Sequence, residues 1–434
     1  AVTVDLSPRK EVPLGCPEKS GDAWAVESTP ELNMVALWVG NGAPLVLASV
    51  DALYAGRELR NAIENALPAV PAENIVLGAS HTHAAPMLDD TKPRFGAVDP
   101  EHMKLVQAQA ATAVSALTNP KNRQRATLKA AAGHAAHSIN RRSVKRVVWV
   151  KPPKFGRRMI GPNYRGATDE TLTTLLLESE AGEPLGVVWN YACHPVSLPW
   201  GRTLSTHYPG VARAALRDRF GPKLPVVFFQ GFSGNTRPSA TAGPRIPTKH
   251  SDLYRRLRFG FTFSPMTPEA YTEWSASLAA KVIDVTRNQI PVPVSFLATS
   301  RLSEPRRRFV EPAGAAVTFQ AAAVGREVSL AAVSGEAMAE TSAKIRRKLP
   351  GRFKLCVGCA DDVVGYLPTD RIVRQGGYEG GDFLEAFGLE RLAPNVGSNV
   401  LAAFSRVIRD LKAAMRGAEE AKPDSVPGGD VPHH

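Results

Sequence analysis

Short apolar runs, each bounded by polar, glycine or proline residues, alternate along this chain with amphipathic segments. Apolar runs of strand length suit strands that are covered on both faces, whereas apolar residues at helical spacing indicate one buried helix face. The runs predict strands at 34–39, 45–50, 74–79, 125–132, 144–150, 171–178, 185–191, 225–230, 292–299, 328–333 and 353–357. The helical pattern predicts helices at 57–67, 101–117, 209–220, 268–288, 336–348 and 395–415. This mixture predicts an α/β fold with mixed sheets flanked by helices.

The remaining segments are rich in proline, glycine and charged residues and predict connections. They comprise an irregular arm at 1–31, a link at 138–141, a loop at 151–168, a long insertion at 239–268 and a basic stretch at 300–318. We expect one catalytic domain over 1–415 that contains the 239–268 insertion. Residues 416–434 are rich in Glu, Lys, Pro and Gly, so they are expected to form a disordered tail.

The composition excludes few classes of protein. Apolar residues make up 44% of the 434 residues and charged residues 22%, which is ordinary for a globular protein, and no apolar run approaches the length of a membrane span. The net charge of +12 favours anionic partners, but the basic residues lie in separate clusters without interleaved aromatics, so nucleic acid is not expected. The expected partner is a small-molecule, lipid or oligosaccharide substrate, and the oligomeric state is open.

The cysteines do not indicate a compartment, whereas the first residues of the chain do bear on it. Cys356 and Cys359 have C-x-x-C spacing at the end of an apolar run, which suits structural thiols or a local disulfide. The chain starts at Ala1 without a methionine, as after removal of a signal or in a trimmed chain. A secreted or periplasmic location is the expectation.

The first candidate for chemistry is the segment that follows the apolar run 75–77. His81 and His83 are two residues apart, so in extended chain they would point to the same side, as metal ligands at a strand end do. The alternative is one core histidine and one surface histidine. His194 and Glu336 also follow apolar runs, and ligands of open α/β sheets bind beyond the carboxyl ends of strands. Imidazole and carboxylate together suit Zn²⁺.

These landmarks, in their order along the chain, resemble the zinc-dependent catalytic domain of the neutral/alkaline ceramidase superfamily. Residues 80–86 resemble the family's Thr-His-Thr-His-Ser-Gly-Pro, and 139–141 resemble its Ile-Asn-Arg. The other matching segments are 190–195, 335–336, 365–369 and 377–380. The resemblance extends from the N-terminal arm to about residue 390 and implies a ceramidase-like catalytic domain.

Carried over position by position, the resemblance implies a role for each of seven residues. The implied zinc ligands are His81, His194, Glu336 and Tyr366, and the implied catalytic residues are His83, Arg141 and Tyr378. Zinc lowers the pKa of a bound water molecule to about 7. A histidine can then move the proton, and an arginine and a tyrosine can stabilise an oxyanion. Together these roles imply hydrolysis of an amide or ester bond.

The sequence departs from the family in the predicted wall of the site. Asn235 and Arg237 stand where relatives have aspartate and serine, and His207 stands where many have aspartate. We expect these three residues to bind substrate, and Arg237 and His207 to favour an anionic one, because arginine grips carboxylate or sulfate through two hydrogen bonds. The expected substrate is therefore an anionic glycan or a lipid-like molecule rather than ceramide. Two alternatives stay open: a zinc-dependent lyase acting on a uronic-acid-containing glycan, and a non-catalytic binding protein on the same scaffold.

Overall fold

The computed structural model describes residues 1–15, 25–144, 158–196, 203–242, 262–264 and 266–420. Its α-helices are α1 (Gly56–Ala66), α2 (Pro100–Thr118), α3 (His207–Phe220), α5 (Pro268–Arg287), α6 (Ala339–Lys348), α7 (Asp370–Gln375) and α8 (Val396–Glu420). Short 3-10 helices are η1 (Ala72–Asn74), η2 (Pro93–Phe95), η3 (Pro120–Asn122), η4 (Ser239–Thr241), η5 (Arg306–Arg308) and η6 (Tyr378–Gly380). None of the described helices has both the length and the apolar character that a membrane span requires.

The strands form three larger sheets and several small ones. A four-stranded sheet has the order β1 (Val2–Asp5), β3 (Glu31–Leu37), β4 (Leu45–Val50) and β5 (Ile75–Ala79). A five-stranded sheet has the order β12 (Val226–Gln230), β10 (Pro184–Tyr191), β9 (Thr171–Ser179), β6 (Ala126–His134) and β14 (Ile290–Pro291). A second four-stranded sheet has the order β15 (Leu297–Glu304), β17 (Val317–Val324), β18 (Val328–Val333) and β20 (Phe353–Val357).

The small sheets supply local pairings near the edges of the larger ones. β13 (Thr236–Pro238), β7 (Ser138–Val144) and β8 (Arg158–Asn163) form a three-stranded sheet. The two-stranded pairs are β2 (Ala25–Val26) with β11 (Thr203–Leu204), β16 (Val310–Glu311) with β22 (Arg391–Leu392), and β19 (Glu336–Ala337) with β21 (Tyr366–Leu367). The last pair places Glu336 directly beside Tyr366.

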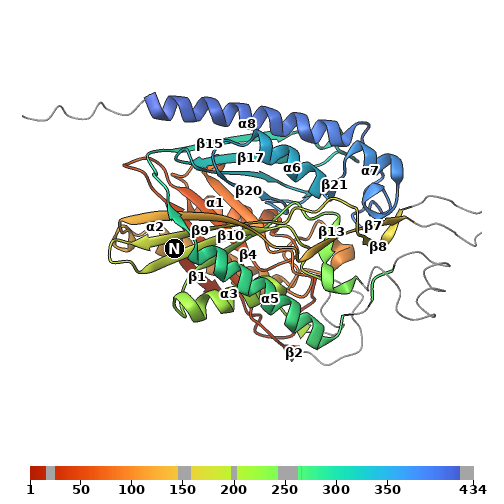
Figure 1. The fold of residues 1–434 in the computed structure, drawn as a ribbon, viewed down its shortest axis with the longest axis horizontal. Coiled ribbons are helices and arrows are strands. Elements are labelled where there is room, and N and C mark those ends of the chain that lie inside the picture. Colours follow the sequence, from red (N-terminus) through yellow and green to blue (C-terminus); the bar gives the residue numbers. More distant parts are fainter. Residues whose placement is uncertain (16–24, 145–157, 197–202, 243–261, 265, 421–434) are drawn as a thin grey trace, which may run out of the picture.

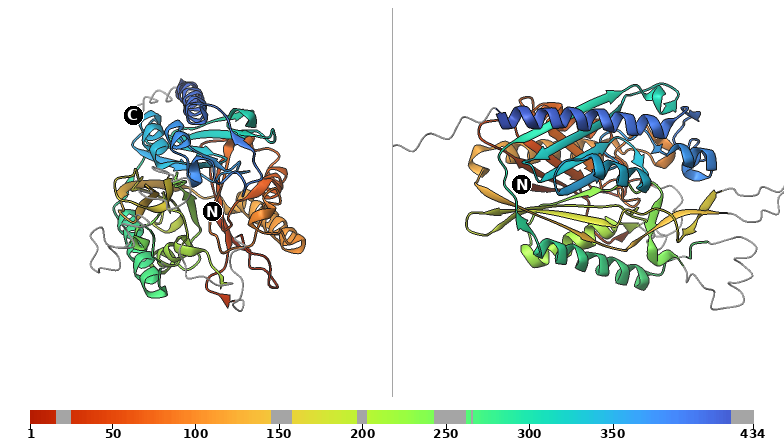
Figure 2. Two further views of the ribbon diagram at one scale, coloured as in Figure 1. Left: turned by 90° about the vertical axis from the view of Figure 1, so that its right-hand side faces the viewer. Right: turned by 45° about the horizontal axis from the view of Figure 1, so that its top comes forward.

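Helices cover the outer faces and the sheets meet inside. α8 runs along one face over β15 and β17, whereas α3 and α5 run along the opposite face against the five-stranded sheet (Figures 1 and 2). α1 and α2 pack together, and α2 also contacts β1 and β3. The predicted fold class, mixed sheets flanked by helices, is confirmed.

The interior is an apolar layer to which all three large sheets contribute. Val76 of β5, Val188 of β10 and Leu330 of β18 belong to one buried cluster. Gly78 allows close packing here, because a Cβ at this position would lie 2.8 Å from Cδ1 of Phe229. The two four-stranded sheets also join through the backbone, since Ala79 N–H donates to the Cys359 carbonyl at 3.0 Å.

Each large sheet contains one parallel pair of strands. β4 pairs with β5, β10 with β12, and β18 with β20, all in parallel. Residues that follow these strands therefore leave the sheets at their carboxyl ends, where ligands of α/β proteins bind. His81 and His83 follow β5, His194 follows β10 and Glu336 follows β18.

Several predicted connections are wrong. The predicted link 138–141 is the first half of β7, and the predicted basic loop 300–318 contains the end of β15, β16 and the start of β17. The predicted strand 292–299 lies later, as β15, and the expected irregular arm begins with β1, which pairs with β3. β1 and β15 are partly exposed, and β7 buries polar and basic side chains, so none of the three forms a continuous apolar run.

Other predictions concern the end of the chain or fall partly outside the described residues. α8 continues to Glu420, so the expected tail does not begin at 416. The predicted strand at 144–150 lies outside the described residues beyond position 144, as do most of the 239–268 insertion and residues 421–434.

Candidate metal centre

Two histidine side chains meet at the carboxyl ends of β5 and β10. Nε2 of His81 lies 3.1 Å from Nε2 of His194. Nδ1 of His81 lies 3.0 Å from the Leu53 carbonyl, and Nδ1 of His194 lies 3.0 Å from the Ser233 carbonyl. A carbonyl oxygen only accepts, so each Nδ1 carries a hydrogen and each Nε2 faces the other. Two imidazole nitrogens at this distance share a positive charge, either a proton or a metal ion. Burial would lower the pKa of His81, but Cys359 and Glu336 raise it well above its usual value, so without a metal this imidazole holds the proton and a bound cation would replace it.

Glu336 supplies a third donor atom to the same point. Its Oε2 is buried without a hydrogen-bond partner among the described residues, and it lies 3.5 Å and 3.4 Å from Nε2 of His81 and His194. Its Oε1 accepts a hydrogen bond from the Tyr54 hydroxyl at 2.8 Å. Buried carboxylate oxygens are normally paired, so this atom suits a bound cation.

The size of this group fits a zinc ion. The three atoms form a triangle with sides of 3.1, 3.4 and 3.5 Å. A point equidistant from them lies about 1.9 Å from each, close to the ≈ 2.0–2.2 Å that zinc takes to imidazole nitrogen and carboxylate oxygen. The donor set therefore fits a divalent ion of this kind, and the backbone carbonyls behind both imidazoles give the orienting contacts that metal-bound histidines use.

His83 stands beside this triangle. Its Nδ1 lies 3.0 Å from the His81 carbonyl, and its ring centroid lies 5.8 Å from that of His194. The candidate ligand atoms of His81, His83 and His194 all lie within 4.8 Å of one another. His83 is thus close enough to act as a further ligand, as well as in the proton transfer that the sequence analysis assigned to it.

The electrostatics favour a cation at the triangle. Burial lowers the pKa of His194 to about 4, with help from Arg141. Burial would raise the pKa of Glu336, but the imidazoles of His81 and His194 hold it well below its usual range. Burial, together with the neighbouring histidines, likewise lowers the pKa of His83 well below its usual value. Neutral imidazole and ionised carboxylate are the forms that bind zinc.

Tyr366 and Arg141 lie next to the triangle. The Arg141 guanidinium donates to the Tyr366 hydroxyl at 2.9 Å and to the Gly234 carbonyl at 2.9 Å. Its carbon lies 5.7 Å from the ring centroids of both Tyr366 and Tyr378. Burial raises the pKa of Tyr366 well above its usual value, so only a strong nearby positive charge would ionise it for metal binding. Its role as a ligand remains a prediction.

Glu379 holds the arginine in place, and sequence reasoning missed it. Its Oε1 accepts from Nε of Arg141 at 2.7 Å, and its Oε2 accepts from Nη1 of Arg142 at 2.6 Å. The carboxylate is buried between two guanidinium groups. A signal existed in the sequence, since Glu379 directly follows Tyr378, but its partners are more than two hundred residues away.

The three predicted substrate residues are placed differently from one another. Asn235 is engaged in structure: its Nδ2 donates to Glu340 at 2.7 Å and its Oδ1 accepts from the Ala339 N–H at 3.0 Å, so it anchors the start of α6. His207 begins α3, and its Nδ1 lies 2.6 Å from Oγ1 of Thr82. Arg237 lies in β13 with its guanidinium carbon 4.3 Å from the Phe263 ring centroid.

Burial also affects Arg237, whose pKa falls to about 10 through desolvation and the repulsion of Arg141. An anion bound beside Arg237 would offset both the desolvation of its guanidinium and the repulsion from Arg141. The pKa of Tyr378 is raised by burial to about 12, so its hydroxyl keeps its proton and can donate.

Two residues of the centre have left-handed backbones. His81 has φ 65° and His207 has φ 54°, a region that is costly for residues other than glycine. Thr82 connects them, because its hydroxyl donates to the Ser205 carbonyl at 2.8 Å and is contacted by His207. Backbone strain of this kind clusters at functional sites.

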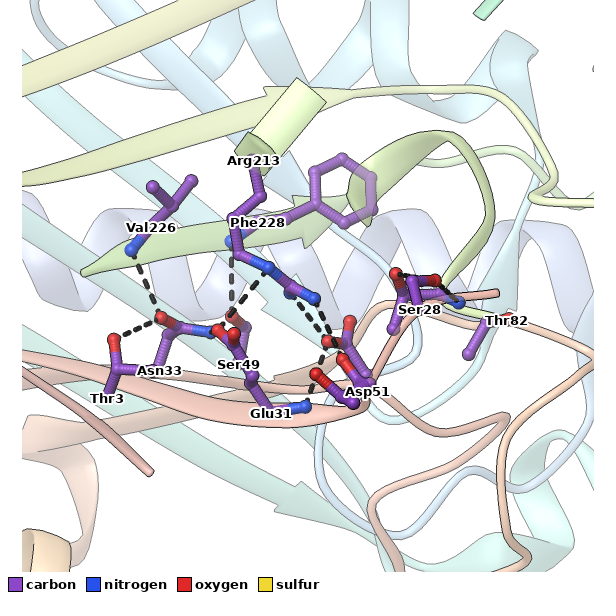
Figure 3. Close-up of polar contacts among 12 residues, drawn as sticks. Thr3, Ser28, Glu31, Asn33, Ser49, Asp51, Thr82, Arg213, Val226 and Phe228 are labelled. Carbon is purple, nitrogen blue, oxygen red and sulfur yellow. Dashed lines mark hydrogen bonds and ion pairs between the residues drawn. The ribbon is translucent and has the colours of Figure 1, made fainter. Parts of the chain in front are cut away.

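A buried ion-pair network joins Arg213 to Asp51 and Glu31 (Figure 3). Arg213 of α3 reaches Asp51 at 2.6 Å and Glu31 at 3.3 Å. Asp51 follows β4, and the next two residues contact His81: the Ala52 carbonyl accepts its N–H at 2.9 Å and the Leu53 carbonyl contacts its ring. The network therefore fixes the backbone that orients the first histidine.

The comparisons with known proteins bear on the fold. No protein-family model matches the chain, and no curated protein sequence does. A neutral ceramidase structure from Pseudomonas aeruginosa matches with a TM-score of 0.70 at 13% identity, over 99% of this chain and 76% of that chain. A ceramidase complexed with C2 matches with a TM-score of 0.70 at 13% identity, over 95% of this chain and 74% of that one. The chain has a ceramidase-like fold. At this identity the likeness concerns the ceramidase-like fold and not the substrate.

Proposed function

We propose that this protein is a zinc-dependent hydrolase that cleaves an amide or ester bond. One observation carries the proposal: Nε2 of two buried imidazoles and an orphaned carboxylate oxygen converge on a point at zinc-binding distance. The ceramidase-like fold and the group of three histidines support a metal-dependent hydrolase.

The neighbouring side chains supply the remaining parts of such a reaction. A bound zinc ion would lower the pKa of a water molecule and polarise the substrate carbonyl. His83 is held by the His81 carbonyl and is largely neutral, so it can accept a proton from the attacking water and pass it to the leaving group. Arg141, which donates to the Tyr366 hydroxyl and lies 5.7 Å from the Tyr378 ring centroid, and the protonated Tyr378 hydroxyl would stabilise negative charge on the carbonyl oxygen.

The substrate we propose is anionic, a glycan or a lipid-like molecule, rather than ceramide. Arg237 is the basis, because a partly desolvated guanidinium beside Arg141 gains most from an anionic ligand. His207 lies at the start of α3 and is joined to the metal-binding segment through Thr82.

The metal is tested first. The purified, metal-replete protein should contain about one zinc per chain, and His194→Ala and Glu336→Ala should lose both zinc and activity. His102→Ala is the matched control, because this buried histidine of α2 lies in an element with no part in the centre and should keep zinc. Full zinc content in both ligand variants would contradict the proposed centre.

The reaction is tested with amide, ester and uronic-acid substrates. Release of an acid together with an amine or alcohol supports the hydrolase. An unsaturated product that absorbs in the ultraviolet would instead establish a lyase, and tight binding of a substrate without turnover would establish a binding protein. Arg237→Gln should raise KM for anionic substrates more than for neutral analogues.

A further inference from the structure

The net positive charge of the chain is concentrated in one stretch of sequence. Residues 138–168 contain nine lysines and arginines and no aspartate or glutamate, whereas the whole chain has a net charge of +12. This stretch includes β7 and β8, which project from one end of the molecule beside α7 (Figures 1 and 2). The excess charge is therefore a local feature of that end and not an even coat over the surface.

Neighbouring carboxylates offset only a small part of this charge. Glu379 is shared between Arg141 and Arg142, and Asp382 follows it in the same segment. When both acidic residues are counted against the nine basic ones, seven positive charges remain. Arg371, which is exposed on α7, adds another positive charge next to the two strands.

Arg158, at the start of β8, lies among other arginines. Its Nη1 donates to the Arg142 carbonyl at 3.3 Å. Burial lowers the pKa of Arg158, and the charges of Arg142 and Arg371 lower it further, with no carboxylate acting in the opposite direction. A guanidinium in these surroundings is stabilised by an anion that approaches from outside the protein.

Two exposed aliphatic side chains accompany Arg158. Val144 is 41% exposed and Ile160 is 42% exposed. Val144 pairs with Arg158 and Ile160 pairs with Arg142 across the two antiparallel strands. Paired residues, and residues two apart on one strand, project from the same face of a sheet. Val144, Arg158 and Ile160 therefore form one mixed apolar and basic face, called here the hairpin face, and β8 is an edge strand of its sheet.

The hairpin face lies next to the candidate metal centre. Arg141, which precedes Val144 by three residues on β7, donates to the Tyr366 hydroxyl in the centre. The loop that carries Tyr378 packs on β8, since a Cβ at Gly377 would lie 2.8 Å from the Cβ of Arg158. A surface that binds the hairpin face would thus lie beside the Arg141 and Tyr378 side of the centre.

We propose that the hairpin face docks on an anionic lipid surface, with Val144 and Ile160 entering the boundary between headgroups and acyl chains. Arg158 would meet the lipid phosphates at the same depth. A lipid surface offers both an apolar layer and a layer of negative charge, which matches the two kinds of side chain on this face. A nucleic acid or a soluble anionic glycan would match the charge but leave the aliphatic side chains in water. The proposal goes beyond the reaction proposed above, and it can be measured without any turnover.

Binding is tested by sedimentation of the full chain with vesicles at low ionic strength. Vesicles of phosphatidylcholine alone are compared with an equal mixture of phosphatidylcholine and phosphatidylglycerol. The protein should bind the mixed vesicles at least about tenfold more tightly, and added salt should weaken that binding. The double variant Val144→Thr/Ile160→Thr keeps β-branched residues in both strands and should weaken binding about tenfold. Arg158→Gln should weaken it about fivefold.

Two control variants separate the hairpin face from the rest of the surface. Ile290→Thr makes the same kind of change at a side chain that is 44% exposed but lies in β14 of the five-stranded sheet. Arg307→Gln removes one positive charge from the exposed surface of η5, so it lowers the net charge by the same amount as Arg158→Gln. Both controls should bind mixed vesicles as the wild type does. Zinc content and the thermal unfolding midpoint should be the same in all of these variants.

Several results would overturn the proposal. Equal binding to neutral and mixed vesicles would remove the role of lipid charge, and unchanged binding of Val144→Thr/Ile160→Thr would remove the role of the apolar side chains. An equal loss in Arg158→Gln and Arg307→Gln would show that net charge alone attracts the vesicles. Binding to heparin without binding to vesicles would assign the face to a polyanion. A dimer that forms without lipid and is lost in the double variant would assign it to a second copy of the chain.

Discussion

Two backbone carbonyls decide which nitrogen of each histidine faces the metal position. Leu53 and Ser233 are not ligands, yet their carbonyl oxygens fix the tautomer of His81 and His194. Tyr54 orients the carboxylate in the same way. Its hydroxyl donates to Oε1 of Glu336, so that Oε2 faces the metal position without a hydrogen-bond partner among the described residues. The donor set is therefore organised by neighbours that contribute no ligand atom.

Tyr54→Phe tests this organisation. Loss of the hydroxyl leaves Glu336 free to rotate, so zinc affinity should fall about 10–100-fold while the fold persists. Competition with a chromogenic chelator measures the affinity. Tyr271→Phe is the control, because its buried hydroxyl has no hydrogen-bond partner among the described residues and its loss should not affect zinc. Equal affinity of Tyr54→Phe and wild type would refute the role of Tyr54.

Arg141→Lys tests the proposed stabilisation of the transition state. Lysine keeps the charge but cannot bind Glu379, Gly234 and Tyr366 together, so kcat should fall about 10²–10³-fold with zinc content unchanged. Arg142→Lys is a matched control, since Arg142 shares Glu379 but not Tyr366. A similar loss in both variants would show that the effect comes from the ion pair and not from the site.

At this scale the sequence indicates the candidate ligands better than the residues that hold them in place. His81, His194 and Glu336 follow apolar runs, and that position is visible in the sequence. Tyr54 and Glu379 act on residues 282 and 238 positions away, and no local pattern predicts such contacts. Asn235 was expected to bind substrate but anchors α6, because an amide in a loop serves either purpose equally well.

Among the elements, α6 connects the metal centre to the five-stranded sheet. Asp169, just before β9, accepts from Arg346 of α6 at 2.9 Å and from the Thr171 N–H at 3.1 Å, and it also pairs with Ser342. Burial would raise the pKa of Asp169, but Arg346 and the hydrogen bonds outweigh burial and lower it below 3.8. The ionised carboxylate therefore stabilises the folded state.

Asp169→Asn should lower the free energy of unfolding by about 3 kcal/mol at pH 7, as loss of one partner of a buried pair does. Because the folded pKa is depressed, this contribution is complete above the unfolded value of 3.8 and is lost as the pH falls below it. The difference between variant and wild type should thus shrink in acid, which urea unfolding at several pH values measures. Asp218→Asn, exposed on α3, should change stability by less than about 0.5 kcal/mol.

Elements were predicted well where burial is complete. β4, β5, β10, β12, β18 and β20 lie inside the molecule and read as apolar runs. β15 was predicted several residues too early because it is partly exposed, and β7 escaped prediction because it buries Asn140, Arg141 and Arg142. A strand that carries site residues has a polar sequence because the site requires it.

For the molecule as a whole, the net charge of +12 sets the long-range field. If the substrate is anionic, this field should accelerate its arrival. Raising ionic strength from about 10 mM to 150 mM shortens the screening length from about 30 Å to 8 Å, so kcat/KM for an anionic substrate should fall about tenfold. A neutral analogue should show little change, and equal salt dependence of the two would argue against steering.

The left-handed backbone of His81 links function and stability at one position. A non-glycine residue at φ 65° costs the folded chain about 1–2 kcal/mol, and the side chain that incurs this cost is one of the proposed metal ligands. Glycine at this position would relieve the backbone cost, but it would leave a cavity where the buried imidazole packs, and such cavities cost about 2–5 kcal/mol. The imidazole therefore offsets, by filling the interior, the backbone strain that it incurs. A screen for heat resistance alone should thus retain a large side chain at residue 81, whereas only a screen for activity should require that it be histidine.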